Sequence, residues 1–94
     1  SQRAQVENAE AEVHIAIEEL SAVQQKLLEA QAELEANATN DKRHDELMQK
    51  GLVSSREQEV VRLARQKSEA SLTSAQANVR AAEAKLRARK AALE

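Results

Sequence analysis

Apolar residues recur in alternating steps of three and four along the first half of the chain. The run holds nine positions without a polar interruption: Val6, Ala9, Val13, Ala16, Leu20, Val23, Leu27, Ala30 and Leu34. This spacing places them on one stripe of an α-helix, at the a and d positions of a heptad repeat. The pattern predicts a long helix, over about residues 2–50, that packs through a narrow stripe against a partner helix.

A matching stripe runs through the second half and predicts a second helix over about residues 54–93. Its members are Val61, Ala64, Ser68, Leu72, Ala75, Val79, Ala82, Leu86, Arg89 and Leu93. We expect the aliphatic stem of Arg89 to lie along the stripe, with the guanidinium outside. The stripes oppose each other when residue numbers sum to 102, which sets large residues against small ones, as for Leu20 and Ala82. The sequence predicts an all-α fold, an antiparallel two-helix coiled-coil hairpin.

We expect both stripes to change phase toward the turn. Leu34 to Ala38 is a second consecutive step of four, and Ser68 to Ala64 repeats that step in the second half. A stutter of this kind locally unwinds a coiled coil. Beyond it the first stripe becomes polar at Asp41, so we expect weak packing next to the turn.

The position of the turn follows from the only glycine of the chain, Gly51, since there is no proline. Glycine is favoured just after a helix because it adopts a left-handed backbone conformation without a Cβ clash. A Schellman ending at Gly51 would pair Leu52 with Leu47. These rules place the turn at about residues 51–53.

The start of the second helix has two candidate caps. Ser54 is followed three residues later by Glu57, the spacing of a capping box. Ser55 with Gln58 is a rival cap one residue further on. We favour Ser54, because it directly follows the predicted turn.

Composition limits the chain to a thin core and a single domain. There are no aromatic residues and no cysteines, and 19 of the 94 residues are alanine. Side chains this small cannot fill a thick core, but they suit a seam between closely spaced helices. We therefore expect residues 1–94 to form one helical hairpin. Because neither end carries a capping signal, we also expect this hairpin to be excised from a larger protein.

Charge is divided between the two halves. The net charge is only −2, so no overall charge attracts the chain to nucleic acid or anionic lipid. Residues 1–50 carry a net −6 and residues 51–94 a net +4. The two halves therefore attract each other, and neighbouring copies could attract in the same way.

No combination of residues indicates catalysis or metal binding. His14 and His44 lie 30 residues apart on one predicted helix, about 45 Å at 1.5 Å per residue, and cannot share a metal. A pair of helices offers its carboxylates no cleft that would shift their pKa values. The basic residues lack aromatic neighbours on which nucleic-acid bases could stack. We expect no enzymatic activity, no cofactor, no metal and no nucleic-acid partner.

The residues around the turn carry a more specific pattern. Arg43, Leu47 and Ser54 follow the spacing Arg-x3-Leu-x6-Ser within the run from Arg43 to Glu59. This run resembles the tip of the helical hairpin of periplasmic adaptor proteins, also called membrane fusion proteins. These proteins belong to tripartite efflux pumps and type I secretion systems. The whole chain resembles such a hairpin, but only about 17 residues carry specific signal.

The resemblance implies a function, partners and a location. The hairpin tip would dock onto a TolC-type outer-membrane channel through Arg43, Leu47 and Ser54. Neighbouring adaptor hairpins would pack laterally, for which Ile17 and Leu28 form a candidate stripe away from the seam. An inner-membrane transporter would be bound through domains absent from this chain. The protein would be periplasmic, with its parent anchored to the inner membrane.

A second interpretation assigns the chain to an unrelated protein. A coiled-coil spacer would use the hairpin only as a rigid connection. A client-gripping or RNA-reaching arm would need apolar or basic surface near the turn. Leu52 and Val53 are the clearest apolar candidates there, and acidic residues offset the basic ones.

Overall fold

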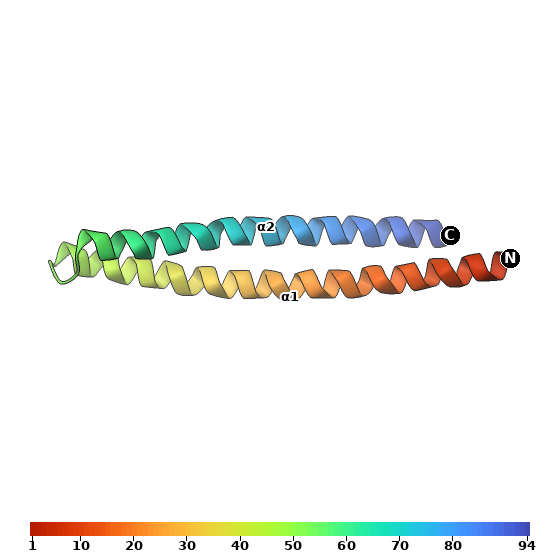
Figure 1. The fold of residues 1–94 in the computed structure, drawn as a ribbon, viewed down its shortest axis with the longest axis horizontal. Coiled ribbons are helices and arrows are strands. Elements are labelled where there is room, and N and C mark those ends of the chain that lie inside the picture. The colour runs from red at the N-terminus through yellow and green to blue at the C-terminus, as the bar shows by residue number, and fades with distance from the viewer. The chain divides into compact units, whose positions relative to one another are not determined.

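The computed structural model describes all 94 residues and contains two α-helices and no strand. Helix α1 spans Gln2–Gln49 and helix α2 spans Ser55–Leu93. The chain divides into two compact units. We call residues Ser1–Leu27 with Ala75–Glu94 the terminal unit, and residues Leu28–Ser74 the turn unit. Within each unit α1 and α2 lie side by side and run in opposite directions (Figure 1), which confirms the predicted antiparallel hairpin.

The terminal unit packs through the predicted stripe of small and aliphatic residues. Ala16 and Ala75 are buried, and the remaining members from Ala9 to Leu27 and from Val79 to Arg89 are half-buried. No large side chain is completely buried. The core of this unit is therefore a single line of contacts, as the high alanine content predicts.

Two ion pairs join α1 to α2 beside this stripe. Lys85 Nζ lies 2.8 Å from Glu19 Oε2, and Arg89 Nε lies 3.5 Å from Glu12 Oε2. Arg89 contacts the neighbour of its predicted opposite residue, so the pairs agree with the register derived from the sequence. Arg89 is half-buried, as expected for a stem that lies along the stripe.

The prediction is wrong for the outermost members of the stripe. Val6 is 50% exposed and Leu93 is 42% exposed, although the heptad spacing assigned both to the seam. Val6 is near the start of α1, and the position predicted to face it, 96, lies beyond Leu93, where α2 ends. Leu93 is itself the last residue of α2 and lies beside the small side chain of Ala9. The heptad spacing alone does not show where one helix ceases to be covered by the other.

The turn unit corrects the predicted stutter. Ala64 is exposed, whereas Arg65 is half-buried and Gln58 is buried. The buried face of α2 therefore continues through positions 68, 65, 61 and 58 in steps of three and four. In α2 the heptad repeat is therefore unbroken, and Gln58, Arg65 and Ser68 are its polar members. In α1 both Asn37 and Ala38 are half-buried, as are both His44 and Asp45, so the half-buried face there is wider than a single heptad stripe and includes the predicted position Ala38.

The connection between the helices forms as predicted, within a residue at each end. Gly51 adopts a φ of +75°, its N–H donates to the Met48 carbonyl, and Leu52 N–H donates to the Leu47 carbonyl, both at 2.9 Å. These two bonds define a Schellman motif, which satisfies carbonyls that the end of α1 leaves free.

Ser54 is the cap of α2, as we favoured over Ser55. Its Oγ accepts a hydrogen bond from the Glu57 N–H at 3.1 Å, and its carbonyl accepts one from the Gln58 N–H at 3.1 Å. The Glu57 carboxylate accepts no hydrogen bond from the Ser54 N–H in return, so only one half of the predicted capping box is present. The Ser54 hydroxyl is thus the only side-chain group that caps the start of α2.

Candidate functional site

Arg43 lies near the end of α1 and projects into solvent. Its side chain is exposed and makes no ion pair or hydrogen bond within the chain. Together with Ala32, Ala36 and Thr39 it borders a shallow hollow on the outer surface of α1. A guanidinium without a local partner has no role in holding the hairpin together, so it is free to bind a partner molecule.

Leu47 and Ser54 both serve the local backbone. The Leu47 carbonyl accepts the Schellman bond and its side chain is half-buried, whereas Ser54 caps α2 and is exposed. With Arg43 they belong to the turn unit, on the last part of α1 and on the connection that follows. Of the three predicted site residues, only Arg43 lacks a structural explanation.

A polar network lies deeper in the turn unit, around Asp41 on α1. Gln58 Nε2 donates to Asp41 Oδ1 at 2.6 Å and approaches the Asp41 carbonyl at 3.4 Å. The other carboxylate oxygen accepts a hydrogen bond from the Arg65 guanidinium. Arg65 also pairs with Glu69 at 2.5 Å. One carboxylate therefore joins two residues of α2 to α1.

This arrangement fixes the charge of Arg65. The hydrogen bond that Arg65 donates to Asp41 raises the pKa of Arg65, and the charges of Glu69 and Asp41 add to the effect, while burial opposes it. The guanidinium therefore stays protonated throughout the range in which proteins are handled. Arg65 therefore contributes a constant positive charge to the seam.

A second polar contact lies one heptad position away from Asp41. Asn37 Nδ2 donates to Ser68 Oγ at 2.5 Å and approaches the Ala64 carbonyl at 3.5 Å. Ser68 is 3% exposed, and its hydroxyl donates to the Ala64 carbonyl at 3.0 Å. The buried hydroxyl has both a donor and an acceptor, so its burial carries little penalty.

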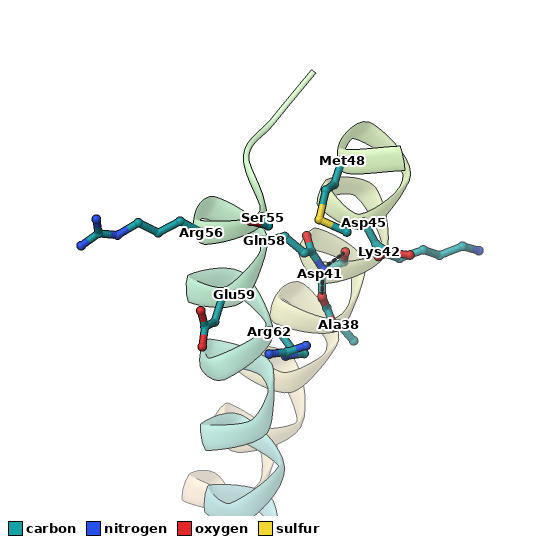
Figure 2. Close-up of a pocket in the computed structure, with 10 residues that line it drawn as sticks. All are labelled: Ala38, Asp41, Lys42, Asp45, Met48, Ser55, Arg56, Gln58, Glu59 and Arg62. Atoms are coloured by element: carbon teal, nitrogen blue, oxygen red, sulfur yellow. Dashed lines mark hydrogen bonds between the residues drawn. The ribbon is translucent and has the colours of Figure 1, made fainter. Parts of the chain in front are cut away.

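An open groove runs along one side of this network between α1 and α2 (Figure 2). It has a volume of about 840 Å³, and its lining includes Asp41, Met48 and Gln58. The groove is open because the residues that flank the seam here, Ala38 and Ser55, have short side chains. Figure 2 shows Lys42 and Arg56 extending away from it on opposite sides.

Gln58 leaves one atom without a partner. The residue is 6% exposed, and its Oε1 is buried and accepts no hydrogen bond. The orientation of the amide is determined by its neighbour, because a carboxylate can only accept and Nε2 must therefore face Asp41. Oε1 is left as an unused acceptor beside the groove.

Sequence reasoning missed Asn37, Gln58 and Arg65. Near the turn it preferred alanines to their polar neighbours, and so placed Ala38 and Ala64 on the stripes instead of Asn37 and Arg65. The signal that could have found them is the heptad itself: continued in steps of three and four past Leu34, it reaches Asn37. Polar residues at such positions are expected to hydrogen-bond across the seam.

The histidines lie apart and have different surroundings. His14 is exposed, whereas His44 is half-buried, with Nδ1 3.0 Å from the Asn40 carbonyl and therefore acting as the donor. No group of three or more histidine, cysteine, aspartate or glutamate residues is arranged to hold a metal ion. Neither helix contains a stretch that is both long and apolar enough to span a membrane.

Comparison of the chain with family models, with curated proteins and with solved structures finds no match.

Proposed function

We propose that this chain is the docking and conduit-forming hairpin of a periplasmic adaptor protein. The adaptor would link an inner-membrane transporter to a TolC-type outer-membrane channel in efflux or secretion. The proposal begins from the resemblance of residues 43–59 to the hairpin tips of that family. The observation that carries it is the state of Arg43, which is exposed and unpaired next to the turn.

The three tip residues would share the work of docking. Arg43 presents five N–H donors in a planar fork, which suits carboxylates or carbonyls at the end of a channel helix. Leu47 is half-buried and would add apolar contact, while the exposed Ser54 would add a hydroxyl. Docking would open the channel only if the hairpin binds the open state more tightly than the closed one.

Binding of the chain to a purified TolC-type channel tests this proposal. The chain is displayed in many copies on a bead or vesicle, so that weak binding by single hairpins adds up to a detectable signal. We expect Arg43→Asp to abolish binding, since it turns attraction into repulsion. Arg80→Asp is the matched control: it makes the same charge change at an exposed, unpaired arginine of the terminal unit and should bind like the wild type.

Circular dichroism checks that both variants keep their helices. If the Arg43→Asp and Arg80→Asp variants bound the channel equally well, Arg43 would have no specific part in binding. That result would contradict the proposed docking role of Arg43. Absence of binding to any TolC-type channel, despite multivalent display, would remove the adaptor function itself.

An arm that grips other proteins is the second candidate function. Leu52 is 69% exposed at the turn, and Val60 and Leu63 are 64% and 53% exposed on the adjoining part of α2. Exposed aliphatic side chains of this kind suit an unfolded client. A client arm should suppress aggregation of a denatured test protein, and Leu52→Ser should weaken that effect while leaving channel binding unchanged.

A further inference from the structure

One side of the terminal unit combines an exposed isoleucine with an open apolar groove. Ile15 of α1 is 55% exposed and borders Lys85 of α2. Lys85 also borders the groove, so the isoleucine and the groove lie on the same side of the unit. The groove has a volume of about 440 Å³. Four small or aliphatic residues line it: Ala22, Val23, Ala81 and Ala82.

Charged residues follow the same side of α1 at intervals of seven. They are Glu12, Glu19 and Lys26, and residues seven apart lie on one side of a helix. Glu19 is paired with Lys85 at 2.8 Å, whereas Lys26 is exposed and forms no ion pair. This side therefore carries a carboxylate beyond the isoleucine and a free ammonium group beyond the groove.

From this arrangement we infer that this side of the terminal unit binds the same side of a second copy of the chain. The two α1 helices run antiparallel, and facing positions have residue numbers that sum to 38. Ile15 of each copy then enters the groove of the other copy beside Val23, and Glu12 of each copy faces Lys26 of the other. Every contact occurs twice, as in any dimer formed by a two-fold rotation.

The spacing along α1 is what selects a second copy as the occupant. Position 19 is midway between Ile15 and Val23, and it is also midway between Glu12 and Lys26. One two-fold axis at Glu19 therefore satisfies the apolar and the charged contacts together, whereas an unrelated partner would require no common midpoint. The two Glu19 carboxylates that meet at the axis are each paired with Lys85, so the centre of the dimer carries no net charge.

Copies that pointed in the same direction could not form this contact. Ile15 and Val23 would then stay about 12 Å apart along the helices, because eight residues separate them. The antiparallel dimer is thus a different association from lateral packing of hairpins whose turns point the same way. It is also separate from Arg43, Leu47 and Ser54, which belong to the turn unit.

Sedimentation over a range of concentrations tests the proposal. We expect a dimer with a dissociation constant of about 0.1 mM, since each copy inserts one isoleucine. Ile15→Ser should weaken dimerisation about tenfold or more. Ile17→Ser is the matched control: Ile17 is 40% exposed in the same unit but lies on a different side of α1, and its substitution should leave dimerisation unchanged.

The charged contact is tested in the same way. Lys26→Glu should weaken the dimer, because it places two carboxylates opposite each other at both ends of the contact. Lys42→Glu makes the same charge change at an exposed lysine of the turn unit and should have no effect. Circular dichroism of each variant establishes that the hairpin remains folded.

Cross-linking tests the position of the axis. The chain has no cysteine, so a short bismaleimide joins only residues that are introduced. Glu19→Cys should cross-link to its own copy, because position 19 lies at the axis. Glu10→Cys should not, because the two copies of position 10 would lie about 27 Å apart along the helices.

Three results would overturn the proposal. The first is a chain that stays monomeric up to about 1 mM, ten times the expected dissociation constant. The second is equal weakening of the dimer by Ile15→Ser and Ile17→Ser. The third is a dimer in which Glu19→Cys cross-links no better than Glu10→Cys. None of these experiments involves a channel, so their failure is distinct from failure of the docking function.

Discussion

In the terminal unit the stripe between α1 and α2 consists of alanine, valine and leucine apart from Arg89, whereas in the turn unit polar residues enter it from Asn37 onward. The terminal unit places its ion pairs beside the seam, at Glu19–Lys85 and Glu12–Arg89. The turn unit places one within the seam, at Asp41–Arg65. One heptad spacing thus supports two ways of joining the same pair of helices.

The difference between the units concerns specificity as much as strength. An apolar stripe of similar residues tolerates a shift of one helix along the other, because each alanine or leucine finds an equivalent neighbour. A buried polar group tolerates no such shift, because it would lose its partner. We infer that the turn unit sets the register and that the terminal unit adds apolar burial.

The largest expected effect comes from breaking the apolar seam. Leu20→Ala should destabilise the terminal unit by about 2 kcal/mol, the lower end of the range for leucine, because Leu20 is only half-buried. Thermal unfolding measures the total loss, and amide hydrogen exchange shows whether protection falls mainly in the terminal unit. Ile15→Ala, at a residue that is 55% exposed in the same unit, is the control and should cost far less.

Breaking the polar seam should have an effect of similar or slightly smaller size. Asp41→Ala removes the carboxylate that accepts from Gln58 and Arg65 and leaves the buried Gln58 amide only the 3.4 Å contact with the backbone carbonyl of residue 41, a penalty of about 1–3 kcal/mol. Amide exchange should accelerate mainly in the turn unit. Loss of protection confined to the terminal unit would contradict the assignment of this network.

A double substitution at Asn37 and Ser68 should not destabilise the hairpin, in contrast to Asp41→Ala. The double substitution Asn37→Leu with Ser68→Ala removes both partners of a hydrogen bond and should be neutral or stabilising in thermal unfolding. The single substitution Ser68→Ala should instead destabilise the hairpin, because the Asn37 amide loses the hydroxyl to which it donates. If the double variant were less stable than the single one, polar packing here would contribute more than we infer.

Removal of the helix cap should have a smaller effect. Ser54→Ala should cost about 1 kcal/mol, because the Glu57 N–H loses its acceptor. Ser55→Ala provides a neighbouring control, since Ser55 caps nothing in the structure, and should leave the melting temperature nearly unchanged. A larger loss for Ser55→Ala would reassign the cap.

The smallest effect is expected at the surface of the terminal unit. Lys85 and Glu19 form a 2.8 Å ion pair, but each side chain is 44% exposed. Lys85→Met should therefore cost about 0.2–1 kcal/mol, and less at high salt. Unfolding measured at low and high ionic strength checks this, and a loss that salt does not reduce would mean that packing of the lysine stem dominates.

Most of the fold could be predicted from the sequence, for physical reasons that particular residues illustrate. Helix–helix packing repeats every seven residues, so the spacing of Ala9 to Leu34 was enough to identify the seam and its register. Gly51 and Ser54 act through local backbone geometry, which short-range rules describe well. These features need no knowledge of distant side chains.

The polar network could not be predicted in the same way. Asn37 and Ala38 are both half-buried, and Asn37 reaches α2 because Ser68 supplies a hydrogen-bond partner. Apolar periodicity identifies only the alanine, because it does not consider such a pairing. The unpaired Gln58 Oε1 is still harder to foresee, because it follows from the orientation of one amide.

The turn at Gly51 has a further consequence for chemical synthesis. Its φ of +75° disfavours L-residues, yet a Cβ built there would meet no atom within 4 Å. The restriction therefore comes from chirality and not from lack of room. A mirror-image residue such as D-alanine prefers this backbone conformation, so it should fit and slightly stabilise the chain by restricting its unfolded state. A fluorophore or cross-linker carried on a D-amino acid could thus be attached between the helices without disturbing either one.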